Sequence, residues 1–122
     1  MRVLIVEDDA RVARLLRTVL RRDGYETVLA ERGDAGWREL TGPDPPVLLI
    51  LDRMLPDMDG ADLLARLRAD DRIARLPVLM LTADIHTSRA LDDGALTRVL
   101  PKPFDLADLR ATCAVLCPGG RT

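Results

Sequence analysis

The chain has 122 residues, of which 48% are hydrophobic and 31% charged, and its formal net charge is −2. This length suits one domain that buries roughly two-thirds of its unfolded surface, and the composition is globular rather than disordered. No apolar run approaches the roughly 20 residues of a membrane span, no signal peptide precedes the first apolar run, and no basic stripe or aromatic platform predicts direct nucleic-acid binding. We therefore expect a cytoplasmic protein that contacts neither membrane nor nucleic acid.

The predicted elements alternate from the first apolar run, a strand over residues 3–6. The helix that follows carries apolar residues at spacings of three and four, with arginines on its other face. It ends at Asp23-Gly24, because glycine closes a helix in the left-handed conformation. A second strand over residues 27–30 leads into a helix that we expect to begin with Asp34 as N-cap and to end before Gly42.

The third strand, residues 47–51, precedes a helix over about 60–69. The fourth strand, residues 78–81, precedes the weakest helix, over about 85–92, and the fifth, residues 98–100, precedes a helix from the cap Asp105 to about Leu116. Cys113 and Cys117 fall on the apolar face of this last helix and are expected in the core rather than at a metal. Five alternations of strand and helix predict a doubly wound α/β domain, a parallel sheet with helices on both faces.

Residues with reactive side chains stand at the ends of four of these strands. Glu7 and Asp8 follow the first, Asp52 the third, Thr82 the fourth and Lys102 the fifth. The carboxyl ends of parallel strands lie side by side, which is where such sheets bind ligands. Carboxylates gathered there repel one another unless a cation neutralises them, and an all-oxygen ligand set suits Mg²⁺. The sequence therefore predicts a magnesium site.

Lys102 is the only lysine among eighteen basic residues. Its compact charge fits beside carboxylate or phosphate oxygens, whereas arginine presents a wide fork. With Mg²⁺ and Lys102 sharing the charge, the Asp52 carboxylate can attack phosphorus while the Thr82 hydroxyl donates to a phosphoryl oxygen. Taken singly, Lys102 also fits a surface lysine, Asp52 a turn acid and Thr82 an ordinary strand residue. Asp9 suits an N-cap at least as well as a ligand role. Only the whole set favours phosphoryl chemistry.

Four motifs in register resemble the receiver domain of two-component response regulators, the CheY-like family. The motifs are Glu7-Asp8-Asp9, the run from Asp52 to Gly60, Thr82-Ala83, and Lys102-Pro103-Phe104. The resemblance covers essentially the whole chain and implies a flavodoxin-like sheet of five parallel strands in the order 2-1-3-4-5. It also implies that Asp52 is the phosphoacceptor for a sensor histidine kinase or phosphotransfer protein.

The same resemblance implies roles for the other motif residues. Mg²⁺ is held by Glu7, Asp8, Asp52 and the backbone carbonyl of Met54. Thr82, Ala83 and Lys102 bind the phosphoryl group, and the Lys102-Pro103 bond is cis, an isomer that proline makes accessible. The implied activity is signalling with at most slow self-dephosphorylation, not enzymatic turnover. An aspartyl-nucleophile hydrolase is disfavoured, because such enzymes commonly carry a second acid where this chain has Met54.

Two features depart from the family pattern. The family usually has an aromatic residue three positions before the lysine, and Val99 stands there in this chain. The fourth helix is also expected to be short. In the family the fourth helix, fifth strand and fifth helix form the face that reports phosphorylation to output partners, so we expect capture of phosphate with a modified or weakened switch. The alternative is a receiver-like scaffold or dimerisation module that works without phosphorylation.

Domain bounds are expected at residues 1–117 for the receiver domain, with 118–122 as a flexible tail or the start of a linker. Because the first strand begins directly after Met1-Arg2, we expect a single-domain regulator or the N-terminal part of a longer one. The expected assembly is a monomer or a weak homodimer.

Overall fold

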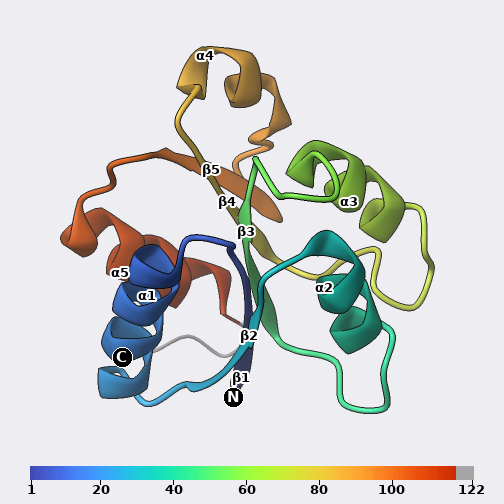
Figure 1. The fold of residues 1–122 in the computed structure, drawn as a ribbon, viewed down its shortest axis with the longest axis horizontal. Helices are drawn as coiled ribbons and strands as arrows, with labels where there is room; N and C mark the ends of the chain where they lie inside the picture. Colours follow the sequence, from blue (N-terminus) through green and yellow to red (C-terminus); the bar gives the residue numbers. More distant parts are fainter. Residues whose placement is uncertain (118–122) are drawn as a thin grey trace.

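A computed structural model describes residues 1–117 of the chain and contains one parallel sheet (Figure 1). Its order is β2-β1-β3-β4-β5, as expected. Each strand lies within a residue or two of its predicted position: β1 (Arg2–Val6), β2 (Glu26–Ala30), β3 (Leu48–Asp52), β4 (Val78–Thr82) and β5 (Thr97–Pro101). Asp52 and Thr82 are thus the last residues of their strands.

Helices cover both faces of this sheet. They are α1 (Ala10–Arg22), α2 (Gly33–Leu40), α3 (Gly60–Arg68), α4 (Ile85–Ser88) and α5 (Leu106–Leu116), and a 3₁₀ turn, η1 (Arg89–Leu91), follows α4. Figure 1 shows α1 and α5 together on one side of the sheet, α2 and α3 on the other, and α4 past the edge strand β5. Within residues 1–117, no helix is long and apolar enough to cross a membrane.

The core is divided into two layers by the central strands. Alternate residues of a strand point to opposite faces, so Val3 and Ile5 pack with α1 and α5, whereas Leu4 and Val6 pack with α2 and α3. Every residue of β3 and β4 is buried, which explains why these strands are apolar up to their last residues. Cys113 and Cys117 are buried in the first layer, in the core as expected.

Acidic side chains cap four of the helices, with Asp84 at the start of α4. Asp9 accepts hydrogen bonds from the amides of Arg11 and Val12 at 2.9 and 3.4 Å, so the cap role proposed for it is the one observed. These bonds hold the pKa of Asp9 below its usual range. Asp59 and Asp105 cap α3 and α5 in the same way.

The expected N-cap of α2 is wrong. Asp34 lies inside the first turn, and Arg32 occupies the cap position without a side-chain hydrogen bond. Asp57, from the loop after β3, supplies the missing acceptor: its carboxylate oxygens receive the amides of Gly33 at 2.8 Å and Asp34 at 2.9 Å. A distant carboxylate satisfies the free amides of this helix, which is why local sequence does not reveal the cap.

The fourth helix is short, as expected, but the α-helical part ends at Ser88 rather than near residue 92. The chain continues as η1 and leaves it in extended conformation at Asp92. The Asp92 carboxylate then accepts the Val99 amide at 2.9 Å and thereby ties this segment to β5. The Asp92 carboxylate thus satisfies a backbone amide of the edge strand β5.

Candidate functional site

The strand order places the predicted site residues at one edge of the sheet. Glu7 follows β1, Asp52 ends β3 beside it, and Thr82 ends β4. The Lys102 amide donates to the Thr82 carbonyl at 2.7 Å, so pairing of β4 with the end of β5 brings Lys102 to this edge. Residues from four separate parts of the chain therefore meet at the carboxyl ends of the strands.

The Lys102 ammonium lies between two carboxylates. Its Nζ is 2.5 Å from Oε1 of Glu7 and 3.3 Å from Oδ1 of Asp52. Glu7 is 2% exposed and Asp52 is 6% exposed, so water screens these charges poorly. One ammonium thus faces two buried acids.

The pKa values at this cluster reflect the shortage of positive charge. Burial and a hydrogen bond with Asp52 raise the pKa of Glu7 to about 7, and Lys102 opposes that rise only in part. Burial alone lowers the pKa of Lys102, but its contacts with Glu7 and Asp52 outweigh burial and raise it. Near neutral pH Glu7 therefore retains a proton part of the time, and a further cation would displace it.

Glu7, Asp8 and Asp52 fit a small divalent cation. Each offers a carboxylate oxygen, and these oxygens all lie within 4.8 Å of one another. Mg²⁺ binds oxygen at about 2.0–2.1 Å, which places opposite ligands about 4.2 Å apart, so small side-chain rotations suffice. Oxygen donors with uncompensated negative charge are the ligands that this ion prefers. This is an acidic site of the kind that binds magnesium.

The loop from Asp52 to Gly60 is folded tightly against the site. The Met54 amide is 3.3 Å from Oδ1 of Asp52. At the far end of the loop, a Cβ atom on Gly60 would lie 2.4 Å from the Asp52 carbonyl oxygen and 3.0 Å from the Arg53 Cα. Only glycine allows this approach, so Gly60 lets α3 begin directly against the backbone of the site.

Thr82 is buried but its hydroxyl is turned toward α4. It accepts the Asp84 amide at 3.0 Å and the Ser88 hydroxyl at 3.2 Å, and it donates to the Asp84 carbonyl at 3.2 Å. Ala83, next along the chain, is exposed. The structure thus places the threonine at the predicted strand end, while its hydroxyl bonds to the segment that follows rather than to the acids.

The two remaining predicted positions lie on and after β5. Val99 packs in the layer that also contains Ile85 of α4. The Lys102–Pro103 peptide bond is cis, the isomer that the resemblance implies.

Sequence reasoning missed Arg53 and Ser88. The Arg53 guanidinium donates to the Asp59 carboxylate at 2.7 Å and to the Ser88 hydroxyl at 2.6 Å. The position of Arg53 directly after Asp52 is a sequence signal that could have marked it as a residue of the site. Nothing local marks Ser88, because its partners lie 6 and 35 residues away.

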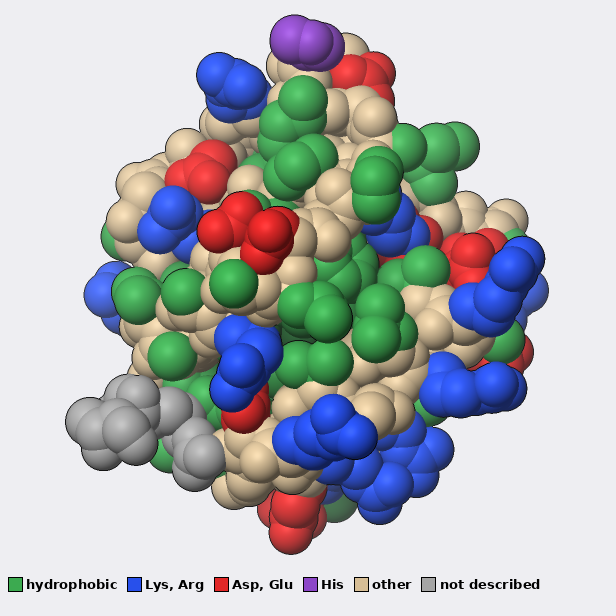
Figure 2. All heavy atoms as spheres, turned by 90° about the vertical axis from the view of Figure 1, so that its left-hand side faces the viewer, with side chains coloured by type: hydrophobic (Ala, Val, Ile, Leu, Met, Phe, Trp, Pro, Cys, Tyr) green, Lys and Arg blue, Asp and Glu red, His purple; other side chains and the backbone are tan. Residues whose placement is uncertain are grey.

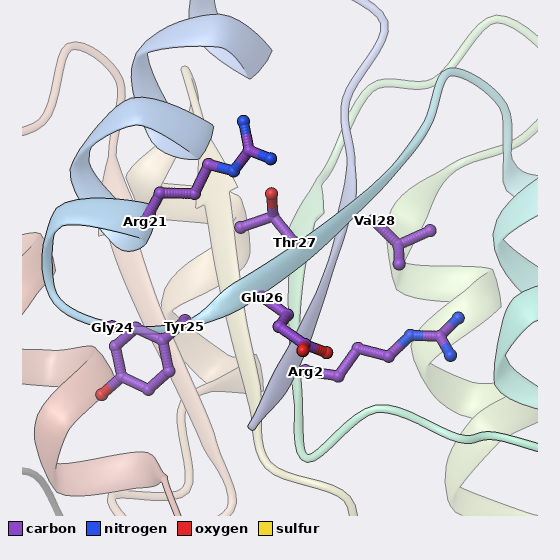
Figure 3. Close-up of a pocket in the computed structure, with 7 residues that line it drawn as sticks. All are labelled: Arg2, Arg21, Gly24, Tyr25, Glu26, Thr27 and Val28. Atoms are coloured by element: carbon purple, nitrogen blue, oxygen red, sulfur yellow. The ribbon is translucent and has the colours of Figure 1, made fainter.

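Two further surface features lie apart from the acids. Figure 2 shows basic side chains gathered over α1, which carries five exposed arginines: Arg11, Arg14, Arg17, Arg21 and Arg22. Figure 3 shows an open hollow at the start of β2, lined by Arg2, Arg21, Gly24, Tyr25, Glu26, Thr27 and Val28. The Thr27 hydroxyl oxygen is buried and has no hydrogen-bond partner among residues 1–117. This hollow opens at the strand end opposite the carboxylates.

Proteins of known role are similar to this chain in sequence. The chain is 38% identical over 108 residues to the chemotaxis protein CheY1 of Helicobacter pylori, which covers 85% of this chain and 86% of that protein. It is 39% identical over 118 residues to the DNA-binding transcriptional regulator RpaA of Synechocystis, which covers 94% of this chain but 48% of the regulator. The chain spans about half the length of that relative.

Solved structures of receiver domains have a similar fold. The signal receiver domain of a histidine kinase from Syntrophus aciditrophicus superposes with a TM-score of 0.82 at 31% identity, over 99% of this chain and 93% of that one. The receiver domain of a sensor histidine kinase from Pseudomonas aeruginosa, with magnesium coordinated in its active site cleft, gives 0.80 at 25% identity, over 94% and 96%. The protein-family model of the response regulator receiver domain matches residues 3–114 of this chain. The chain therefore belongs to the response regulator receiver domain family of two-component signalling.

Proposed function

We propose that Asp52 accepts a phosphoryl group from a sensor histidine kinase or a phosphotransfer protein. The observation that carries this proposal is the position of the Lys102 ammonium, 3.3 Å from Asp52 and 2.5 Å from Glu7 at the ends of β3 and β1. Receiver domains are signalling proteins that interact with histidine kinases, and they are not enzymes that turn over an external substrate.

Glu7, Asp8 and Asp52 are the proposed protein carboxylates for Mg²⁺, with the Met54 backbone carbonyl as a further ligand. The acidic cluster and the magnesium bound by the Pseudomonas relative support this assignment. When bound, Mg²⁺ neutralises the acids and the phosphoryl oxygens. A second cation beside Lys102 would favour the ionised form of Glu7.

The proposed transfer needs little from the protein beyond positioning and charge. A carboxylate oxygen of Asp52 attacks phosphorus in line with the breaking phosphorus–nitrogen bond of a phosphohistidine, and the product is an aspartyl phosphate. Lys102 pairs with the charge on the transferred group. Thr82 turns from α4 toward a phosphoryl oxygen, and Ala83, exposed beside it, lines the same approach.

Labelling by acetyl phosphate with Mg²⁺ tests the assignment. Wild-type chain should gain the mass of one phosphoryl group, and Asp52→Asn should gain none. Asp62→Asn is the matched control, because Asp62 is exposed in the first turn of α3 and should label normally. Persistent labelling of Asp52→Asn would contradict the proposal.

Output through α4, β5 and α5 is proposed to use a modified switch. Val99 and its neighbours Ile85, Arg89, Asp92 and Pro101 line an open hollow where the family usually has an aromatic ring. Without that ring, amide NMR shifts on adding a phosphoryl mimic should be small along β5. Large shifts extending evenly across residues 84–104 would contradict a modified switch.

The receiver unit is proposed to span residues 1–117, which contains the family match to 3–114. The expected tail or linker, residues 118–122, lies outside the described part of the chain.

A further inference from the structure

The Thr82 hydroxyl has no spare hydrogen-bonding capacity in this conformation. A hydroxyl offers one donor and two acceptor positions. Here the Asp84 amide and the Ser88 hydroxyl occupy the acceptors at 3.0 and 3.2 Å, and the Asp84 carbonyl takes the donor at 3.2 Å. To reach a phosphoryl oxygen on Asp52, Thr82 must break bonds on the α4 side.

The bond from Ser88 is the one that reaches into α4. Ser88 is fully buried, at 0% exposure. When Thr82 turns away, the Ser88 hydroxyl loses its acceptor in a place that water does not reach, and an unpartnered buried hydroxyl is costly. The end of α4 must then shift to supply a new partner.

Arg53 fixes the direction of this bond. Its guanidinium donates to the Ser88 oxygen at 2.6 Å, and a guanidinium can only donate. The Ser88 proton is therefore left to point toward Thr82. Arg53 is itself held by Asp59 through Nε at 2.7 Å and NH2 at 3.3 Å, and this contact raises the pKa of Arg53, which stays charged.

We propose that Ser88, oriented by Arg53, is a positioning residue that holds Thr82 away from Asp52 until phosphorylation breaks the Thr82–Ser88 bond and releases α4. The inference rests on the proposed phosphorylation of Asp52. The Thr82–Ser88 bond would give this chain a polar link from the site to α4. Val99 provides no aromatic ring that could serve as such a link.

Binding of beryllium fluoride with Mg²⁺, followed by amide NMR, tests the link. Ser88→Ala removes the hydroxyl that stabilises the resting conformation, so the mimic should bind about fivefold more tightly. The amides of Arg89, Ala90 and Leu91 in the unliganded variant should already be shifted toward their bound positions, and adding the mimic should move them less than in wild type.

Two controls separate this link from a structural role of Ser88. Thr87→Ala removes an exposed hydroxyl from the same helix. That hydroxyl bonds to Asp84 and not to Thr82, so the substitution should leave the affinity for the mimic unchanged. In a Thr82→Ala background, Ser88→Ala should no longer change affinity, because the bond is already gone. Tightening of equal size in that background would overturn the proposal.

The remaining outcomes distinguish the link from the phosphorylation that it requires. If wild type binds the mimic and Ser88→Ala binds it equally well, the link is wrong and the phosphoacceptor stands. If wild type binds none, the phosphoacceptor proposal fails and the link fails with it. Should Ser88→Ala not fold, Arg53→Met decides: it keeps the apolar stem, removes the guanidinium, and should also tighten binding, whereas unchanged affinity would overturn the proposal.

Discussion

Lys102 and Glu7, 95 residues apart in the sequence, form a partly buried ion pair with 2.5 Å between Nζ and Oε1. The pair does not exhaust the negative charge beside it, because Asp52 lies 3.3 Å from the same ammonium. The lone lysine of the chain thus serves two acids at once. This unequal count of charges makes the site responsive to pH and to divalent cations.

Stability of the metal-free chain should fall as pH rises from about 4.5 to 7. The pKa of Glu7 is about 7 in the folded chain against 4.5 for an unperturbed glutamate, so the folded state binds the extra proton within this window. The stabilisation is complete below 4.5 and is lost as pH rises through 7. Urea unfolding in chelator at pH 5 and pH 8 measures it. Glu7→Gln should lack this part of the pH dependence, and an equal slope in both proteins would refute the assignment.

Replacing Lys102 by methionine should separate cation binding from phosphoryl binding. Removing the neighbouring ammonium leaves the acids less neutralised, so calorimetry should show Mg²⁺ bound at least as tightly as in wild type. Beryllium fluoride should bind about tenfold or more weakly, because a charge-assisted contact is lost. Arg98→Met, on β5 shortly before Lys102 but paired with Asp92, should change neither. Weaker Mg²⁺ binding by Lys102→Met would count against the proposed division of roles.

Gly60→Ala should destabilise the chain by about 3 kcal/mol, the cost of overpacking a site that cannot relax. Helix propensity alone would predict a gain, because alanine favours helix over glycine. The close approach to the Asp52 carbonyl and the Arg53 backbone decides the sign. Asp62→Ala in the same helical turn is exposed and should change the free energy of unfolding by less than about 1 kcal/mol. Urea denaturation that finds Gly60→Ala as stable as wild type would disprove this close contact.

Asp59 combines a helix cap with an ion pair, and two substitutions separate them. Asp59→Ala should cost about 2 kcal/mol, from the lost bond to the Ala61 amide at 2.8 Å and the lost contact with Arg53. Asp59→Asn keeps a capping oxygen and should cost about half as much. Arg53 and the Ala61 amide lower the pKa of Asp59, so the advantage of wild type over Asp59→Asn is present above about pH 4 and is lost as pH falls further. An advantage that persists in acid would show that charge is not its cause.

Sequence periodicity predicted β1, β3 and β4 well because these central strands are buried on both faces. Their apolar runs, such as residues 78–81, leave few alternatives. Cap residues were predicted where the acceptor is local, as at Asp105. The cap of α2 could not be predicted, since Asp57 reaches it from 24 residues away.

The acidic part of the candidate site was predictable because parallel strands bring their ends together whatever the details of packing. Glu7, Asp52 and Lys102 meet as expected. The orientation of the Thr82 hydroxyl was not predictable, because it depends on Ser88 at the end of α4 and on Arg53 after β3. Side-chain direction at a strand end follows from tertiary contacts rather than from local pattern.

Chemical identification of the phosphorylated residue tests most directly whether Asp52 is the phosphoacceptor. Borohydride reduces an aspartyl phosphate to homoserine, so the chain is phosphorylated with acetyl phosphate and Mg²⁺, reduced, digested and sequenced by mass spectrometry. We predict homoserine at position 52 alone, with none when Mg²⁺ is chelated. Homoserine at Asp8 or Asp59, with Asp52 unmodified, would contradict it.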